Sequence, residues 1–182
     1  WLYEHAPVDA RWCLVHATHV DADEVQRMLA SQAVVGLCPI TEANLGDGLF
    51  DAQRYLAAGG RFGIGSDSHI HIGLAEELRL LEYGQRLESR GRNLLCAPGA
   101  GTGETLFRAA VSGGAQALGQ PVDGLRAGQR ADFVVLDDTH PSLVARPVER
   151  MIDSWVFAGD RTCVRDVHVA GRRVVADGRH VA

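Results

Sequence analysis

The chain has 182 residues, of which 46% are hydrophobic and 23% are charged, and its formal net charge is −5. This composition is that of a globular protein, and the negative charge argues against nucleic acid or an anionic membrane as a partner. No apolar run approaches the roughly 20 residues of a membrane span. Four scattered cysteines without close pairing predict reduced thiols, and therefore a cytoplasmic location.

The first part of the chain alternates short apolar runs with helical patterns. Apolar residues, capping residues and glycines predict the following strands and helices: strands at 12–15, 34–38 and 62–64, and helices at 21–31, 51–58, 74–90 and 102–118. A polar stretch at residues 41–48 reads as a loop. Because buried strands that alternate with helices form parallel sheets, we expect an α/β fold.

The strand at residues 62–64 leads directly to Asp67, and a helical pattern follows. A buried strand that ends in a carboxylate before a helix is typical of a (β/α)8 barrel, where catalytic groups lie at the C-terminal ends of the strands. Three strand–helix units are visible, whereas a whole barrel takes about 250 residues. Residues 1–120 are therefore expected to form only part of a barrel.

The pattern changes near residue 121. We expect strands at 131–137 and 151–157, and a β-hairpin that joins residues 164–169 to 172–175. Residues 121–182 are therefore predicted to form a separate, small β domain.

The candidate catalytic residues are histidines and a carboxylate at the predicted strand ends. His16 and His19 follow the first strand, and Asp67 and His69 follow the third. Taken singly, Asp67 is equally explained as a helix-capping aspartate, and the two histidines as loop residues. Together, a histidine and an aspartate at one edge of a parallel sheet can activate water beside a divalent metal. His69 and His71 have a spacing that can ligate a metal, but they lie beyond the strand, and we assign them no joint metal site.

Six stretches of the sequence resemble the amidohydrolase superfamily. They are LVHATHVD (14–21), LCPITEANLGDG (37–48), GSDSH (65–69), EELRLLEYGQR (76–86), GLRAGQRADFVVLD (124–137) and VAGRRVVADG (169–178). The resemblance implies the C-terminal part of a (β/α)8 TIM barrel, about strands 6–8, followed by strands of a small β-sandwich. It also implies a homodimer that needs the upstream half of the barrel.

The resemblance also implies roles for individual residues. Asp67 corresponds to the aspartate that binds one divalent metal, Zn²⁺, and carries the proton. His16 corresponds to the histidine that orients the attacking hydroxide, and His69 is placed near the substrate. The superfamily's HxH metal pair, its His-x-x-Glu motif and the arginine and tyrosine expected to bind substrate carboxylates would lie upstream and are not in this sequence.

Residues 41–48 and 82–86 are the most specific of the resembling stretches. They are similar to the branch of the superfamily that hydrolyses a linear amidine C–N bond, converting N-formimino-L-glutamate to N-formyl-L-glutamate and ammonia in histidine degradation. One alternative is a guanine- or adenosine-type aminohydrolase, whose pocket would be apolar rather than arginine-rich. Another is a non-catalytic α/β module, because one metal ligand cannot close this active site alone.

Overall fold

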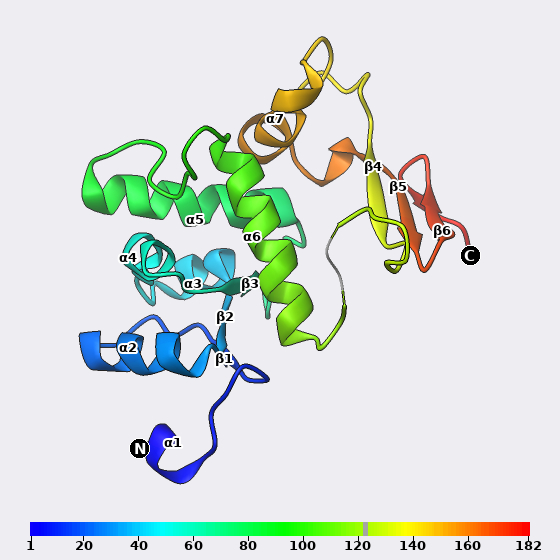
Figure 1. Cartoon of the computed structure of the whole chain (residues 1–182). Helices are drawn as coiled ribbons and strands as arrows, with labels where there is room; N and C mark the ends of the chain where they lie inside the picture. The colour runs from blue at the N-terminus through cyan, green and yellow to red at the C-terminus, as the bar shows by residue number, and fades with distance from the viewer. Residues whose placement is uncertain (122–123) are drawn as a thin grey trace.

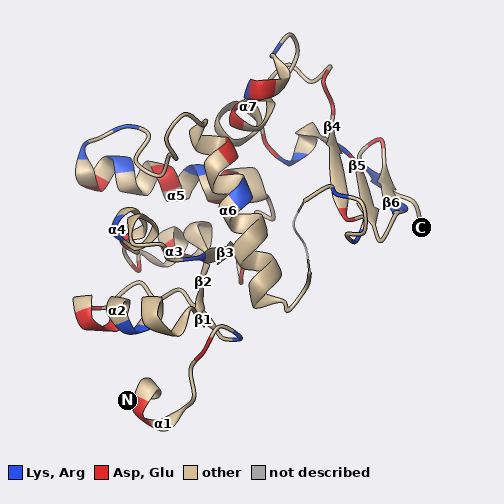
Figure 2. Ribbon diagram, viewed as in Figure 1, with Lys and Arg blue, Asp and Glu red and all other residues tan. Residues whose placement is uncertain are grey.

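The computed structural model describes residues 1–121 and 124–182, and it contains one parallel and one antiparallel sheet (Figure 1). The parallel sheet has the order β1-β2-β3, formed by β1 (Cys13–Val15), β2 (Val34–Leu37) and β3 (Phe62–Ile64). Both pairings are parallel. None of the three strands carries a charged side chain (Figure 2). The predicted α/β fold with a parallel sheet is confirmed.

Helix α2 (Ala22–Ser31) leads from β1 to β2 and begins with a capping box. The Asp21 carboxylate accepts from the Glu24 backbone N–H at 2.8 Å, and the Glu24 carboxylate accepts from the Asp21 N–H at 2.9 Å. Reciprocal capping satisfies two backbone donors that a helix start leaves free. It also defines where the loop after β1 ends.

Helices α3 (Pro39–Leu45) and α4 (Ala52–Ala57) connect β2 to β3. The loop expected at residues 41–48 is wrong up to Leu45, because these residues continue the helix that starts at Pro39. Proline is favoured at the first helical position, where its missing N–H and fixed φ carry no penalty. The polar composition of the stretch concealed this helix start.

Helices α5 (Leu74–Ser89) and α6 (Thr102–Ala117) follow β3 and complete the main core. Helix α6 lies against β3 and β2, whereas α5 packs on α3 and α4. The buried side chains come from the strands and from the helices packed against them, among them Val25, Met28, Val35, Leu37, Phe62, Leu78, Leu106 and Val156. This core holds the three parallel strands, and therefore their C-terminal ends, in place.

The strand predicted at residues 151–157 is wrong, because these residues form the helix α7 (Met151–Ala158), which follows the 3₁₀ turn η1 (Val148–Arg150). Trp155 and Val156 are buried, and α7 packs on α5 and α6. The Arg79 side chain of α5 donates to the Val156 carbonyl at 2.7 Å. An unbroken apolar run fits a strand and a buried helix equally well. The predicted division of the chain into part of a barrel (residues 1–120) and a separate β domain (residues 121–182) stays a prediction.

The antiparallel sheet has the order β4-β5-β6-β7 and lies to the right of α6 in Figure 1. Its strands are β4 (Phe133–Leu136), β5 (Val164–Val169), β6 (Arg172–Ala176) and β7 (Arg179–His180), and the 3₁₀ turn η2 (Arg161–Cys163) precedes β5. The predicted hairpin is confirmed, with Ala170 and Gly171 at φ 49° and 78° in its turn. Strand β7, of only two residues, was not predicted.

A short helix, α1 (Leu2–His5), precedes β1. Within the described residues, every helix falls short of the length and apolar character that crossing a bilayer requires.

Candidate active site

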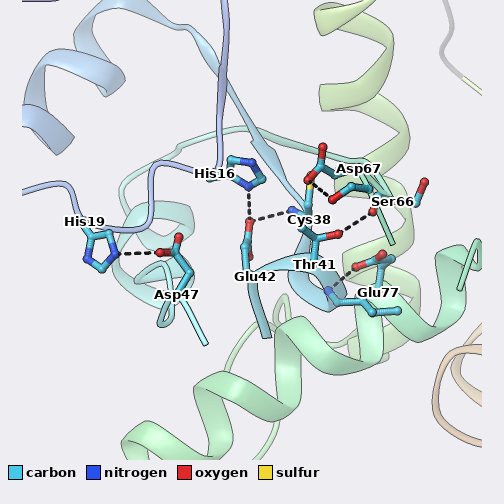
Figure 3. A network of polar contacts seen from close by, with 11 residues as sticks. His16, His19, Cys38, Thr41, Glu42, Asp47, Ser66, Asp67 and Glu77 are labelled. Atoms are coloured by element: carbon cyan, nitrogen blue, oxygen red, sulfur yellow. Dashed lines mark hydrogen bonds and ion pairs between the residues drawn. The ribbon is translucent and has the colours of Figure 1, made fainter. Parts of the chain in front are cut away.

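The C-terminal ends of the three parallel strands meet at one edge of the sheet, and polar residues follow each of them (Figure 3). His16 comes directly after β1, and Cys38 comes directly after β2. Backbone hydrogen bonds continue the ladder past the strand ends, from His16 N–H to the Gly36 carbonyl at 2.8 Å and from Gly65 N–H to the Leu37 carbonyl at 3.0 Å. The first residues beyond the strands are therefore held by the sheet itself.

His16 and Asp67 both adopt a left-handed backbone conformation, with φ of 65° and 51°. Residues other than glycine are uncommon in this region, and such residues cluster at functional sites. Ala17, next to His16, has φ 52° as well. The chain therefore turns sharply at both predicted catalytic positions, immediately beyond β1 and three residues beyond β3.

Asp67 is exposed at this edge, and the preceding residue, Ser66, is held by two hydrogen bonds to its carbonyl. The Ser66 carbonyl accepts from the Thr41 hydroxyl at 2.8 Å and from the His69 N–H at 3.2 Å. Among the described residues, the Ser68 hydroxyl, at 3.5 Å, is the only group within hydrogen-bonding reach of the Asp67 side chain. Its oxygens are therefore open to a ligand.

His16 is paired with a buried carboxylate that the sequence analysis missed. The Nδ1 atom of His16 lies 3.2 Å from Oε1 of Glu42, and the same oxygen accepts the Cys38 N–H at 2.8 Å. Glu42 is 6% exposed and lies on α3, in the stretch read as a loop. The helix-starting Pro39 was the signal that would have placed Glu42 in the first turn of a helix, five residues beyond the end of β2.

Two further buried groups lie beside this pair. Burial raises the pKa of the Cys38 thiol to about 11, with the charges of Glu42, Asp67 and Glu77 acting in the same direction. Burial also raises the pKa of Glu77 to about 7, although the Ile40 N–H donates to its Oε2 at 2.8 Å and favours the charged form. Cys38 is therefore a neutral thiol at pH 7, and Glu77 is close to its midpoint.

His19 and His69 are placed differently from His16. The Nε2 atom of His19 lies 3.4 Å from Oδ1 of Asp47, in an exposed pair. His69 accepts the His71 N–H on its Nδ1 at 3.0 Å, which leaves Nε2 as its available nitrogen. Substrate binding by His69 stays a prediction.

Residues 2–174 match the amidohydrolase family. The chain belongs to the amidohydrolase family. It is 58% identical to formimidoylglutamate deiminase of Pseudomonas aeruginosa over 181 residues. The matched region is 99% of this chain and 40% of the Pseudomonas protein. It is also 32% identical over 171 residues to 5-methylthioadenosine/S-adenosylhomocysteine deaminase of Halalkalibacterium halodurans, covering 90% of this chain and 36% of the relative. The chain thus spans about 40% of the length of these relatives.

Solved amidohydrolase structures share the fold. An amidohydrolase from Brucella melitensis superposes with a TM-score of 0.90 at 50% identity, covering 100% of this chain and 40% of that one. An adenosine deaminase from Xanthomonas campestris with bound zinc superposes with a TM-score of 0.82 at 23% identity, covering 96% of this chain and 39% of that one. One solved structure of this fold therefore contains zinc.

Two groups of side chains among the described residues are close enough to consider as metal ligands, with ligand atoms within 4.8 Å: His16, Cys38 and Glu42, and His140, Asp160 and Cys163. The first contains a protonated thiol and a hydrogen-bonded imidazole. In the second, the His140 ring contacts the Thr162 hydroxyl through Nε2 and accepts the Ser142 N–H on Nδ1.

Both ring nitrogens of His140 are therefore already in use. Asp67, with open carboxylate oxygens, fits zinc as one ligand of the roughly four that zinc takes.

Proposed function

We propose that the full-length amidohydrolase hydrolyses N-formimino-L-glutamate to N-formyl-L-glutamate and ammonia. The observation that carries this proposal is the 58% identity to the Pseudomonas formimidoylglutamate deiminase over 99% of the chain. The geometry supports it, because His16 and Asp67 follow neighbouring ends of one parallel sheet. In the reaction, the oxygen of water bonds to the formimino carbon, the C–N bond to the terminal nitrogen breaks, and that nitrogen leaves as ammonia.

Asp67 is the proton carrier in this proposal. Its exposed carboxylate would hold one zinc ion, which supplies an acidified water at neutral pH. Asp67 accepts the proton that the attacking water loses and returns it to the departing nitrogen, which must be protonated to leave. The left-handed backbone at Asp67 sets the carboxylate beyond the end of β3, where a substrate can reach it.

His16 orients the attacking water in this proposal. Its backbone N–H is bound to the Gly36 carbonyl and its Nδ1 faces Glu42, so Nε2 is the ring nitrogen left for the reacting groups. With its proton on Nδ1, the neutral ring can only accept through Nε2, so it orients the attacking water by accepting a hydrogen bond from the water O–H. His69, on the loop after β3, supplies a polar contact to the substrate.

We also propose that the full-length protein completes a fold of which this chain is one part. The three parallel strands correspond to about strands 6–8 of a (β/α)8 barrel, and the antiparallel sheet to part of a β-sandwich. In support, β1 lies at the edge of the parallel sheet with Val15 57% exposed, as expected if another strand covers it. The rest of the barrel supplies the other metal ligands and the groups that bind the substrate carboxylates. A cytoplasmic homodimer, acting in histidine degradation, completes the proposal.

The test is a comparison of substrates on the zinc-loaded, full-length protein. Ammonia release from N-formimino-L-glutamate should exceed release from S-adenosylhomocysteine, adenosine or guanine by orders of magnitude in kcat/KM. The deaminase relative at 32% identity makes S-adenosylhomocysteine the second candidate. Preference for S-adenosylhomocysteine would replace the proposed substrate, and activity on none of the four would refute it.

A further inference from the structure

The carboxylate of Glu42 is the least expected group at the strand ends. It is 6% exposed, and a carboxylate that leaves water must replace its hydration with hydrogen bonds from the protein. Both of its hydrogen bonds converge on one oxygen, Oε1, from the Cys38 N–H and the His16 ring (Figure 3). Such a group persists where its partners hold it in a fixed geometry.

Helix capping explains only half of this arrangement. Cys38 is the N-cap residue of α3, and its N–H is one that the helix does not satisfy, so Glu42 acts as a local cap. The contact to His16 is of another kind, because it joins α3 to the residue after β1, 26 positions away. This contact holds the His16 imidazole against helix α3.

We infer that Glu42 is a positioning residue for His16, which holds its imidazole as the Nδ1–H tautomer and aims Nε2 at the reacting atoms. The inference deepens the proposed function and depends on it for the role of His16. A carboxylate oxygen accepts, so the 3.2 Å contact puts the ring proton on Nδ1. A hydrogen bond donated by one ring nitrogen of a neutral histidine fixes the tautomer, and the other ring nitrogen is then left without a proton.

A metal ion shared by His16, Cys38 and Glu42 is the competing explanation of the cluster. The Glu42 oxygen that would bind the ion already accepts the Cys38 N–H at 2.8 Å, and burial raises the pKa of the Cys38 thiol in the absence of a metal. The His16–Glu42 distance is also that of a direct hydrogen bond. The positioning role therefore accounts for more of the geometry than a metal does.

The experiment uses the full-length protein and two substitutions of Glu42. Glu42→Gln keeps an oxygen that can accept from His16 and Cys38, whereas Glu42→Leu has similar volume and no acceptor. Asp47→Asn is the matched control, because it alters the exposed carboxylate paired with His19. Circular dichroism and melting temperature report whether each variant folds.

Two readouts are measured. Nitrogen-15 NMR of labelled histidine, with the His16 signals assigned from a His16→Asn spectrum, should show the Nδ1–H form in the wild type and in Glu42→Gln, and its loss in Glu42→Leu. With N-formimino-L-glutamate, kcat should fall on the order of 10–100-fold in Glu42→Leu with KM little changed, and Glu42→Gln should recover most of it. Asp47→Asn should match the wild type in both.

An Nε2–H tautomer in the wild type overturns the inference whether or not the leucine variant folds. Wild-type kcat in both Glu42 variants overturns it as well, and so does stoichiometric zinc that is lost on replacing Cys38 with serine. Failure of the proposed function looks different. In that case the tautomer still depends on Glu42, but the wild-type protein does not turn over N-formimino-L-glutamate.

Discussion

Gly113 on α6 and Phe62 on β3 approach each other so closely that no side chain fits between them. A Cβ atom built on Gly113 would lie 1.9 Å from the Phe62 carbonyl oxygen. Because backbone occupies the other side of the contact, a side chain could be accommodated only by moving the helix away from the sheet. The contact holds α6 against the strand that leads to Asp67.

Gly113→Ala should therefore destabilise the protein. Overpacking at a backbone contact costs on the order of 3 kcal/mol, and chemical denaturation measures the loss. Gly114→Ala is the matched control, because a Cβ there meets nothing within 4 Å. Alanine is about 1 kcal/mol better than glycine inside a helix, so this variant should be stabilised. Equal effects of the two substitutions would contradict the close approach of α6 and β3.

Glu77 should make stability depend on pH. Its pKa is raised by burial to about 7 from a usual value of 4.5, so the native state holds a proton that the unfolded chain has released between these values. Stability is therefore lost as pH rises from about 4.5 to about 7 and is not regained above that range.

Glu77→Gln keeps an acceptor for the Ile40 N–H and removes this ionisation. The variant should melt close to the wild type at pH 4.5 and higher at pH 8, by on the order of 5 °C. Glu88→Gln, at an exposed position on the same helix, is the control and should show no such pH-dependent gain. A constant difference between Glu77→Gln and the wild type across this pH range would show that Glu77 does not titrate there.

Asp67→Asn should lower kcat on the order of 10²-fold or more and reduce zinc content in the full-length protein. The amide cannot accept the proton of the attacking water, and general acid–base catalysis alone accounts for a loss of this size. The measurements are steady-state turnover of N-formimino-L-glutamate and metal analysis of the purified variant. Wild-type turnover with wild-type zinc content would remove Asp67 from the mechanism.

The strands and most helices could be predicted from the sequence because each carries a local signal. The run before Asp67 is apolar and ends in glycine, and α2 begins with a capping box between Asp21 and Glu24. Helix α7 could not be predicted in this way, because its apolar residues pack against α5 and α6, which only the folded structure brings next to it. Burial on several sides removes the periodicity that would identify a helix.

In the candidate site, too, some residues have a local sequence signal and others do not. His16 and Asp67 could be proposed because each follows a strand in sequence, and strand ends in a parallel sheet share one edge. Glu42 and Glu77 could not, because nothing in their local sequence reports burial or an approach to a residue 26 to 37 positions away. Carboxylates in polar stretches are usually exposed, and only tertiary packing makes these two exceptions.

His16 and His19 offer the clearest choice between neighbouring residues. His16 is held by the Gly36 carbonyl at its backbone and by buried Glu42 at its ring, so its direction is fixed. The His19 side chain is 75% exposed, and its only hydrogen-bond partner among the described residues is the exposed Asp47 carboxylate, at 3.4 Å. His16→Ala should lower kcat on the order of 10²-fold, whereas His19→Ala should stay close to the wild type. Steady-state kinetics of both variants of the full-length protein measure this, and an equal or larger loss in His19→Ala would reverse the assignment.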